Sequence, residues 1–192
     1  MSKILYVMDN NQEKNYDYDI SEDTIIYHFS INSSCNIKAN LIKEGVSLYY
    51  YYSNINYANN VFKITVNHKA NNTHSELFNH GVNVLEAKLD YDIEGIVMKD
   101  YSGCICNQDN QIINMSNGKS SILPKLLIDN YDVDSNHSAY IGKFNRDQLF
   151  YLMSRGLSFE EANRLLLNGF LISMDSIDLN KIKFFLDELE KI

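Results

Sequence analysis

Proline, tryptophan and cysteine are scarce in this sequence, which has one proline, no tryptophan and three cysteines in 192 residues. An odd and small number of cysteines excludes a disulfide framework as the main source of stability. Free cysteines are typical of a reducing compartment, so we expect a cytoplasmic protein.

Long apolar runs are also missing. No segment approaches the roughly 18 apolar residues that a membrane-spanning helix requires. The first residues, Met1–Asn10, turn polar after a short apolar run and lack the apolar stretch and cleavage site of a signal peptide. We therefore expect no membrane association.

Positive charge is limited, with 17 Lys and Arg residues against 25 Asp and Glu residues and a formal net charge of −8. Nucleic acids and anionic lipid surfaces are bound by clustered basic side chains, so neither is an expected partner. The sequence also lacks a glycine-rich phosphate loop and the nucleophile elbow of hydrolases.

Hydrophobic residues make up 45% of the chain and come in short runs before about residue 140. Many alternate with polar residues, as in Ile37–Leu41 and Phe62–Val66, which is typical of strands. In the run Tyr49–Tyr52, alternation places two rings in the core and two on an outer face. The predicted strands are Thr24–Phe29, Asn36–Leu41, Val46–Tyr52, Val61–Val66, Val82–Leu89 and Ile93–Met98. No repeat of fixed period is evident, so this pattern alone leaves a sandwich, a barrel and a β-solenoid open.

The last 50 residues change to helical spacing. Asn145 and Gln148 resemble a capping box before a helix at Arg146–Arg155, and Gly156 suits the position after its end. Ser158–Glu161 is a stricter S-x-x-E box before a second helix. The apolar stripe expected on this second helix consists of Ala162, Leu165, Leu166 and Phe170. A third helix is expected after Asp178, with an apolar stripe of Ile182, Phe185, Leu186 and Leu189.

Four segments of this tail carry a family resemblance: His137–Phe144, Asp147–Leu152, Ser154–Ser158 and Glu160–Ala162. In order and spacing they resemble the C-terminal signature of the SufB/SufD family. That signature has a His before a small-residue turn, a Gly-Lys, a D-Q-L-F-Y-L-like helix, an S-R-G turn and an E-E-A helix. Pro124 lies thirteen residues before His137, as in the family.

The resemblance implies a fold that the strand pattern leaves open. SufB and SufD proteins are right-handed parallel β-helices followed by C-terminal helices. For this chain, the resemblance implies a mainly β fold with a β-helix core at residues 1–140 and a helical subdomain at 141–192. Family members carry a longer N-terminal portion before the solenoid, and we expect a short, SufD-like member that lacks it.

The resemblance also implies a function in iron–sulfur cluster assembly. SufB and SufD pair through their β-helices, and the C-terminal helices of each hold a SufC ATPase. The chain is therefore expected to be a non-catalytic scaffold that docks a SufC-type ABC ATPase and pairs with a SufB-like partner or with itself. The expected docking residues are Arg146, Leu149, Phe150, Tyr151, Arg155, Gly156, Glu160 and Glu161. The alternative role of these helices is to cap the open end of the solenoid.

Three residues are candidate ligands for iron or a transient iron–sulfur cluster, the only cofactors that the resemblance implies. His137 matches a His that SufB and SufD carry near their shared interface, and imidazole is a suitable iron ligand. Cys104 and Cys106 form a C-x-C pair whose thiols share one face of a strand, about 7 Å apart. Thiolates are natural ligands of iron–sulfur clusters. The simpler interpretation of the pair is that two small side chains fill a narrow interior. Cys35 is expected to be isolated in the core.

Two positions depart from SufB. Ser138 follows the His where SufB has a Glu. The position expected for a functional SufB cysteine falls near Asp109, within Gln108–Asn110, where no Cys occurs. Both departures favour a SufD-like partner subunit. The alternatives are a shortened ATPase-binding module without cluster chemistry and an unrelated β-solenoid enzyme or binding protein.

Overall fold

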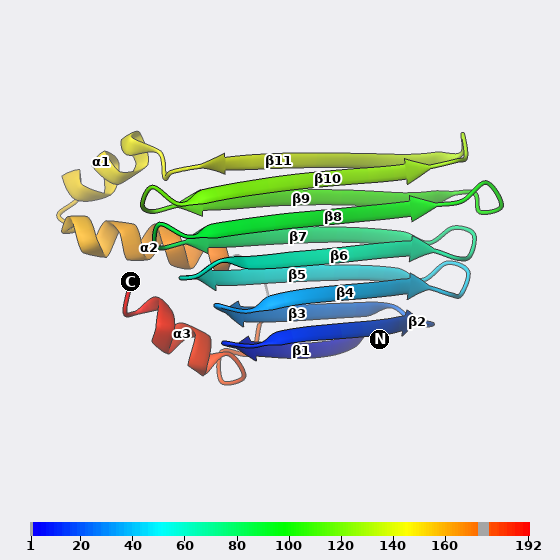
Figure 1. Ribbon diagram of the computed structural model, residues 1–192, viewed down its shortest axis with the longest axis horizontal. Helices are drawn as coiled ribbons and strands as arrows, with labels where there is room; N and C mark the ends of the chain where they lie inside the picture. The colour runs from blue at the N-terminus through cyan, green and yellow to red at the C-terminus, as the bar shows by residue number, and fades with distance from the viewer. Residues whose placement is uncertain (1, 173–176) are drawn as a thin grey trace.

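The structure is a computed structural model that describes residues 2–172 and 177–192, which form eleven strands and three short helices. The strands alternate between two parallel sheets that face each other as the two sides of a flattened solenoid (Figure 1). Sheet A contains β1 (Lys3–Asn10), β3 (Thr24–Ile31), β5 (Ser47–Asn56), β7 (His74–Asn83), β9 (Cys104–Asn114) and β11 (Val133–Gly142). Sheet B contains β2 (Glu13–Ile20), β4 (Ser34–Leu41), β6 (Asn60–His68), β8 (Lys88–Val97) and β10 (Lys119–Ile128). The predicted parallel β-solenoid is confirmed.

Alternate side chains of each strand fill the space between the sheets. The tyrosine run on β5 divides as predicted: Tyr50 and Tyr52 are fully buried, whereas Tyr49 and Tyr51 lie on the outer face. Inside, the ring of Tyr52 stacks on Phe62 with centroids 3.7 Å apart, and Tyr91 packs edge-on against both. These rings from β5, β6 and β8 form the centre of the core.

Each coil lies in register on the next, but the coils differ in length. One row of outward residues on sheet A contains, in order, Tyr6, Tyr27, Tyr51, Phe78, Asp109 and Ser138. Successive members of this row are 21, 24, 27, 31 and 29 residues apart. The extra residues are absorbed in the turns, which explains why the sequence shows no fixed period.

Asparagine occupies several turns for a conformational reason. Asn11, Asn32 and Asn72 have φ angles of 50°, 48° and 56°, in the left-handed region that asparagine tolerates better than most residues. The side chain of Asn32 also donates to Asn11 Oδ1 of the coil below, at 2.8 Å. These asparagines therefore have a structural role in the turns.

One predicted strand is wrong. Val82–Leu89 spans the end of β7 at Asn83 and the start of β8 at Lys88. Asn83 closes the intervening turn by donating from its side chain to the carbonyl of Ala87, at 2.8 Å. Apolar residues on both sides of this turn conceal it in the sequence.

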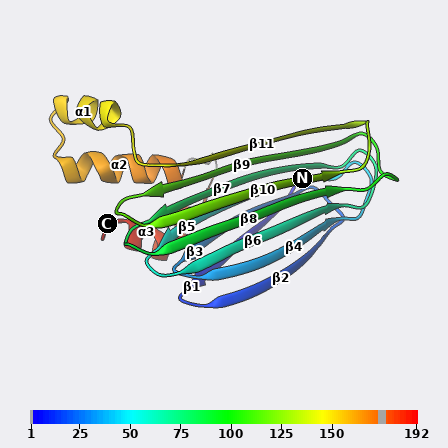
Figure 2. The ribbon, with the colours of Figure 1, turned by 45° about the horizontal axis from the view of Figure 1, so that its top comes forward.

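The helices α1 (Arg146–Ser154), α2 (Phe159–Leu171) and α3 (Lys183–Leu189) gather at one end of the solenoid (Figure 2). α2 and α3 pack on the outer face of sheet A, where Ser53 donates a 2.7 Å hydrogen bond to the carbonyl of Leu171. α1 buries none of its residues. No helix within the described ranges is long and apolar enough to span a membrane.

The helix ends follow the sequence signals with one exception. Ser158 and Glu161 form the predicted capping box, and Gly156 adopts a φ of 98°. Asn145 caps α1 by accepting from the backbone N–H of Asp147, so the expected box with Gln148 does not form.

The predicted apolar stripe of α2 is partly wrong. The residues that α2 buries are Ala162, Leu167 and Leu171, whereas Leu165 is 52% exposed. Only the side of α2 that packs on sheet A is buried, and Leu165 lies on a different side of the helix.

We expect Phe62→Ala to lower the free energy of unfolding by about 3 to 5 kcal/mol, because it removes the ring on which Tyr52 and Tyr91 pack and leaves a cavity. Urea unfolding measures the change. Val61→Ala is the matched control, because Val61 precedes Phe62 on β6 and is 45% exposed. The control should change stability by less than about 0.5 kcal/mol. Equal effects of the two substitutions would contradict this description of the core.

Candidate functional site

Cys104 and Cys106 lie inside the solenoid on β9. Both are buried, and Cys104 Sγ lies 3.4 Å from the hydroxyl of Thr73. Burial raises the pKa of Cys106 to about 11. The raised pKa makes Cys106 a poor nucleophile. Within the described residues, neither Cys104 nor Cys106 belongs to a group of three converging ligand-type side chains, so both suit the role of small interior side chains.

His137 lies apart from both cysteines. It is exposed on β11, where it pairs in register with Gln108. Cys104 pairs with Val133, at the start of β11. The ligand atoms of His137, Cys104 and Cys106 do not converge to a potential metal site in the part of the chain that the structure describes. The structure brings the two cysteines to one interior face and leaves His137 at the open end of the stack.

Asp109 is the centre of a hydrogen-bonded cluster on the outer face of sheet A. Ser138, its register partner on β11, donates to Asp109 Oδ1, and Gln111 donates to Oδ2 at 2.9 Å. His80 on β7 lies 3.3 Å from the same carboxylate and 3.0 Å from the carbonyl of Phe170 in α2. The imidazole therefore connects the sheet to the helical subdomain.

The charge of Asp109 is stabilised by these contacts. The hydrogen bond from His80 is the main cause that lowers the pKa of Asp109 to about 2, with smaller contributions from Ser138 and Gln111. Burial opposes this shift but is outweighed. The carboxylate is consequently ionised over the whole physiological range.

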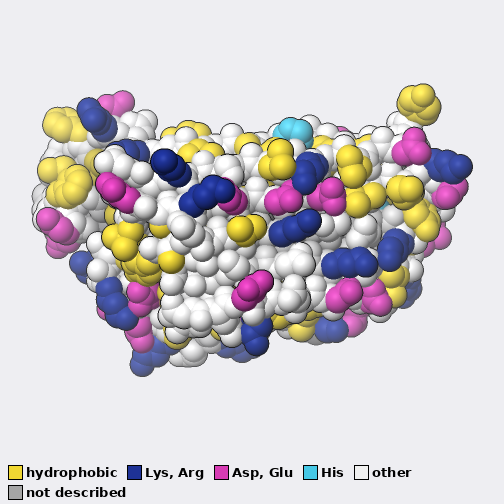
Figure 3. Space-filling view, viewed as in Figure 1, with side chains coloured by type: hydrophobic (Ala, Val, Ile, Leu, Met, Phe, Trp, Pro, Cys, Tyr) yellow, Lys and Arg dark blue, Asp and Glu magenta, His cyan; other side chains and the backbone are white. Residues whose placement is uncertain are grey.

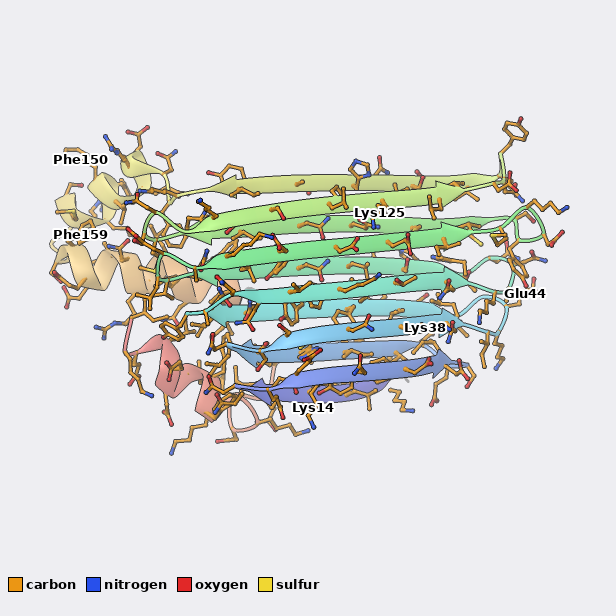
Figure 4. All side chains as sticks on the ribbon, viewed as in Figure 1. Lys14, Lys38, Glu44, Lys125, Phe150 and Phe159 are labelled. Atoms are coloured by element: carbon orange, nitrogen blue, oxygen red, sulfur yellow. The ribbon has the colours of Figure 1, made fainter. Side chains whose placement is uncertain are left out.

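The predicted docking residues lie on a surface of α1 and α2 that is rich in apolar side chains. Phe150 is 75% exposed and Tyr151 is 56% exposed, with the guanidinium of Arg155 5.1 Å from the Tyr151 ring centroid. Figure 3 shows hydrophobic side chains gathered over this end of the molecule. In Figure 4, Phe150 of α1 and Phe159 of α2 both lie at the helical end of the molecule, away from the strands.

A groove of about 560 Å³ follows the same surface. Arg146, together with apolar side chains, lines it; the apolar ones include Met115, Phe144, Leu149, Phe150, Met153 and Phe159. Of the remaining predicted residues, Gly156 turns the chain between the helices, Glu161 forms the capping box and Glu160 is exposed. The structure therefore places three of the eight expected docking residues, Arg146, Leu149 and Phe150, along one groove.

A second cluster was not predicted from the sequence. Asp9 of β1, His28 of β3 and Cys35 of β4 meet inside the first coils, and all three are buried. Asp9 Oδ2 lies 2.8 Å from His28 Nε2 and 3.1 Å from Cys35 Sγ, and the sulfur lies 3.9 Å from the same ring nitrogen. Cys35 is in the core as predicted, but the expectation that it is isolated is wrong.

Neighbouring side chains hold this cluster in place. Asp9 Oδ1 accepts from the hydroxyl of Tyr16 at 2.6 Å and from Gln12 Nε2 at 2.8 Å. His28 Nδ1 lies 2.6 Å from the hydroxyl of Tyr50. The three ligand-type atoms are thus oriented toward one another by a surrounding set of hydrogen bonds.

The protonation states of the cluster follow from burial and hydrogen bonding. Burial raises the pKa of Asp9, but hydrogen bonds from His28, Tyr16 and Cys35 outweigh it and hold this pKa at about 2. Burial lowers the pKa of His28, and burial together with the hydrogen bond to Asp9 raises that of Cys35 well above its usual range. At neutral pH the carboxylate is charged, while the imidazole and the thiol are neutral.

No local signal identifies this cluster in the sequence. Asp9, His28 and Cys35 fit no metal-binding spacing, because they belong to three strands and two coils. Their meeting depends on the register of β1 on β3 and on the tight turn between Ile31 and Ser34. Only the folded stack of coils shows it.

Comparison with known proteins relates the chain to proteins of iron–sulfur cluster assembly. The family described as "SUF system FeS cluster assembly, SufBD core domain" matches residues 12–170. The chain is 35% identical over 96 residues to the iron–sulfur cluster assembly protein SufD of Bacillus subtilis, a match that covers 50% of this chain and 22% of that protein.

Two further relatives give similar matches. The iron–sulfur cluster assembly protein SufB of Bacillus subtilis is 34% identical over 107 residues, covering 54% of this chain and 23% of SufB. A SufBD family protein of Porphyra purpurea is 29% identical over 111 residues, covering 54% of this chain and 21% of that protein. The matched part is thus less than a quarter of each relative.

The Asp109 cluster predicts a pH-dependent contribution to stability. The folded-state pKa of Asp109 is depressed, so its contribution is present above the unfolded-state pKa of about 3.9 and is lost as the pH falls through about 2. We expect Asp109→Asn to lower the free energy of unfolding by about 1 kcal/mol at pH 7, because solvent screens a side chain that is 33% exposed. Urea unfolding at pH 7 and near pH 2 measures both states.

The difference between Asp109→Asn and the unaltered protein should disappear near pH 2. Asp134→Asn serves as the control, because Asp134 is an exposed carboxylate on the adjacent strand β11. A difference that persists at pH 2 would show that the effect of Asp109→Asn does not come from the charge.

Proposed function

The chain belongs to the SufBD family, and from this premise we propose that it acts as a SufD-like scaffold subunit of the SUF system for iron–sulfur cluster assembly. The observation that carries the proposal is the exposed apolar surface of α1 and α2, which suits the docking of a SufC-type ATPase. Because the chain covers less than a quarter of its relatives, the partners proposed below are inferences from this surface and from the open end of the solenoid.

Two substituted positions support the SufD-like assignment. Ser138 stands where SufB is expected to have a Glu, and Asp109 lies near the position expected for the SufB Cys; the two residues are register partners and hydrogen-bond to each other. His80 completes the pair from a third strand. This arrangement is internally satisfied and offers no thiol, which favours a partner subunit over one that builds clusters by itself.

The docking proposal rests on the exposure of α1. A helix of nine residues is only marginally stable in water by itself, and burial of an apolar face normally supplies its stability. α1 has apolar residues but buries none of them, and its Phe150 is 75% exposed. An apolar helix surface beside a groove is a common binding mode for a partner protein, and aromatic residues often supply most of the binding energy.

We expect Phe150→Ala to weaken binding of a cognate SufC-type ATPase by about 2 kcal/mol, or roughly 30-fold in Kd. The reason is that the substitution removes the most exposed large apolar side chain of α1. Titration of the full-length chain with the purified ATPase, by calorimetry or fluorescence, measures the affinity.

Tyr131→Ser provides a matched control for this experiment. Tyr131 is a fully exposed aromatic residue in the turn before β11, at the end of the solenoid away from the helices. Its substitution should leave the affinity unchanged. If the folded, unaltered chain does not bind the ATPase, or if both variants bind equally well, the docking proposal is wrong.

The second partner surface that we propose is the end of the stack formed by β10 and β11. β11 pairs with β9 on one side and is the last strand of sheet A, so its other edge carries unpaired backbone groups. Ile141 is in register with the buried Ile112 but is itself 42% exposed, because no further coil covers it. A SufB-like partner or a second copy of this chain would extend the sheet and cover these residues.

His137 belongs to the same open end and is the predicted iron ligand that a partner could reach. We propose that any iron or cluster bound here is cargo held between subunits, with His137 supplying one ligand and the partner the others. Cys104 and Cys106 lie inside the coil and are the less accessible candidates.

We expect Ile141→Lys to weaken pairing with a SufB-like partner, or self-association, by about tenfold or more, because a lysine at an exposed edge opposes sheet extension. Light scattering after gel filtration and titration with the partner measure the change. Ile4→Lys is the control, since Ile4 is 53% exposed on β1, the edge strand at the opposite end of sheet A. Equal loss of pairing in both variants, with folding intact, would contradict the assignment of the interface to β11.

A further inference from the structure

The interior of the first coils contains a set of donor atoms that the proposed function does not use. Asp9 Oδ2, His28 Nε2 and Cys35 Sγ lie within 4.8 Å of one another, and each comes from a buried side chain. In the described residues no other group of three or more His, Cys, Asp or Glu side chains converges in this way. Oxygen, nitrogen and sulfur donors thus face one point from three different strands.

The arrangement does not suit nucleophilic catalysis. In a Cys–His–Asp triad the imidazole uses one ring nitrogen for the thiol and the other for the carboxylate. Here Asp9 and Cys35 both lie at Nε2 of His28, and Nδ1 is occupied by Tyr50. The thiol donates to the carboxylate at 3.1 Å, so the imidazole is not positioned as its base.

The same arrangement suits a metal ion. Tetrahedral bonds of about 2.0 to 2.3 Å from Zn²⁺ to such donors place the donor atoms about 3.3 to 3.6 Å apart. The observed separations are 2.8, 3.1 and 3.9 Å, so modest side-chain adjustments would fit the ion.

The neighbours resemble the outer ligand sphere of a metal site. Metal-binding histidines usually donate from the second ring nitrogen to a hydrogen-bond partner, and Tyr50 occupies that position beside His28. Bound carboxylates are usually hydrogen-bonded as well, as Asp9 is by Tyr16 and Gln12.

Two buried hydroxyl groups give a separate indication of a metal site. Ser30 and Tyr52 are fully buried, and Ser30 Oγ and Tyr52 OH have no hydrogen-bond partner in the described structure. Ser30 is the register partner of Asp9 on the neighbouring strand, and the Tyr52 ring packs 5.0 Å from that of His28. A metal-bound thiolate would be the acceptor that these two donors otherwise lack.

The charge balance of the interior also favours a bound metal ion. The interior contains no buried Lys or Arg among the described residues, so no protein cation is available to neutralise Asp9. A divalent cation bound to one carboxylate and one thiolate would form a neutral unit, which a buried site requires.

We propose that Asp9, His28 and Cys35 form a binding site for one divalent transition-metal ion of the Zn²⁺ or Fe²⁺ class, which fixes the first coils of the solenoid. Binding releases the Cys35 thiol proton to solvent and moves the imidazole proton to Nδ1, where it is donated to Tyr50. The fourth position is left to a water molecule or another small ligand. Half-buried Gln12 and Tyr16 border the site and offer the route by which an ion enters. This proposal is independent of membership in the SUF system and of the docking surfaces.

Co²⁺ is the probe that tests the site. The full-length chain, stripped with a chelator and refolded anaerobically with Co²⁺, should bind one equivalent and show a thiolate-to-cobalt charge-transfer band with tetrahedral visible bands. Zn²⁺ should displace the cobalt and raise the Tm of the unaltered protein, because the ion binds only the folded state.

Two cysteine variants locate the site. Cys35→Ala should abolish the charge-transfer band and weaken Co²⁺ binding by at least about 100-fold, whereas Cys104→Ala should retain both. Cys104 is the matched control because it is also a buried thiol inside the solenoid. Tyr50→Phe, which keeps all three ligands, should weaken binding by about tenfold.

The proposal can be tested even if Cys35→Ala does not fold, because the Co²⁺ spectrum and the rise in Tm are measured on the unaltered chain. The proposal is wrong if the folded chain binds no Co²⁺, or if it binds Co²⁺ without a sulfur charge-transfer band. It is also wrong if Cys104→Ala loses the band while Cys35→Ala keeps it.

Discussion

The in-register stacking of parallel coils is the constraint on which the rest of this structure depends. Every strand of the two sheets hydrogen-bonds to strands one coil away, so the backbone of each coil is satisfied only when its neighbours are in place. Side chains at the same position of successive coils then lie directly above one another. The aromatic centre at Tyr52, Phe62 and Tyr91 and the asparagine contacts in the turns both follow from this geometry.

Stacking also decides which polar groups meet inside. An interior position cannot hold an unpaired polar group without a large cost, so polar residues there must find partners on other coils. Asn79 donates to Asn110, and His68 contacts Thr73 and Ser75. Within the ranges that the structure describes, the Asp9, His28 and Cys35 cluster is the one such group that combines metal-ligating atoms with unsatisfied hydroxyls beside it.

The two ends of the strands and the two ends of the stack have different roles. At one end of the strands, α2 and α3 cover the outer face of sheet A, and His80 and Ser53 attach α2 to it through backbone carbonyls. α1 remains outside this packing and presents the apolar groove. The last coil, with β10 and β11, leaves interior-type positions exposed. The proposed scaffold, with one partner on its helices and another on its open edge, would use both features.

The sequence determined the local elements and the family. Alternation along Phe62–Val66, the capping box at Ser158 and Glu161, and the signature from His137 onward depend on neighbouring residues, so a single sequence reveals them. It could not give the strand boundaries near Asn83, the exposure of Leu165 or the meeting of distant side chains. Coils of 21 to 31 residues are stacked in register, and the length of each turn sets that register. Only the tertiary structure therefore decided that Asp9 meets His28 and Cys35, and that Asp109 meets Ser138 and His80, because these contacts depend on how the backbone hydrogen bonds align whole coils.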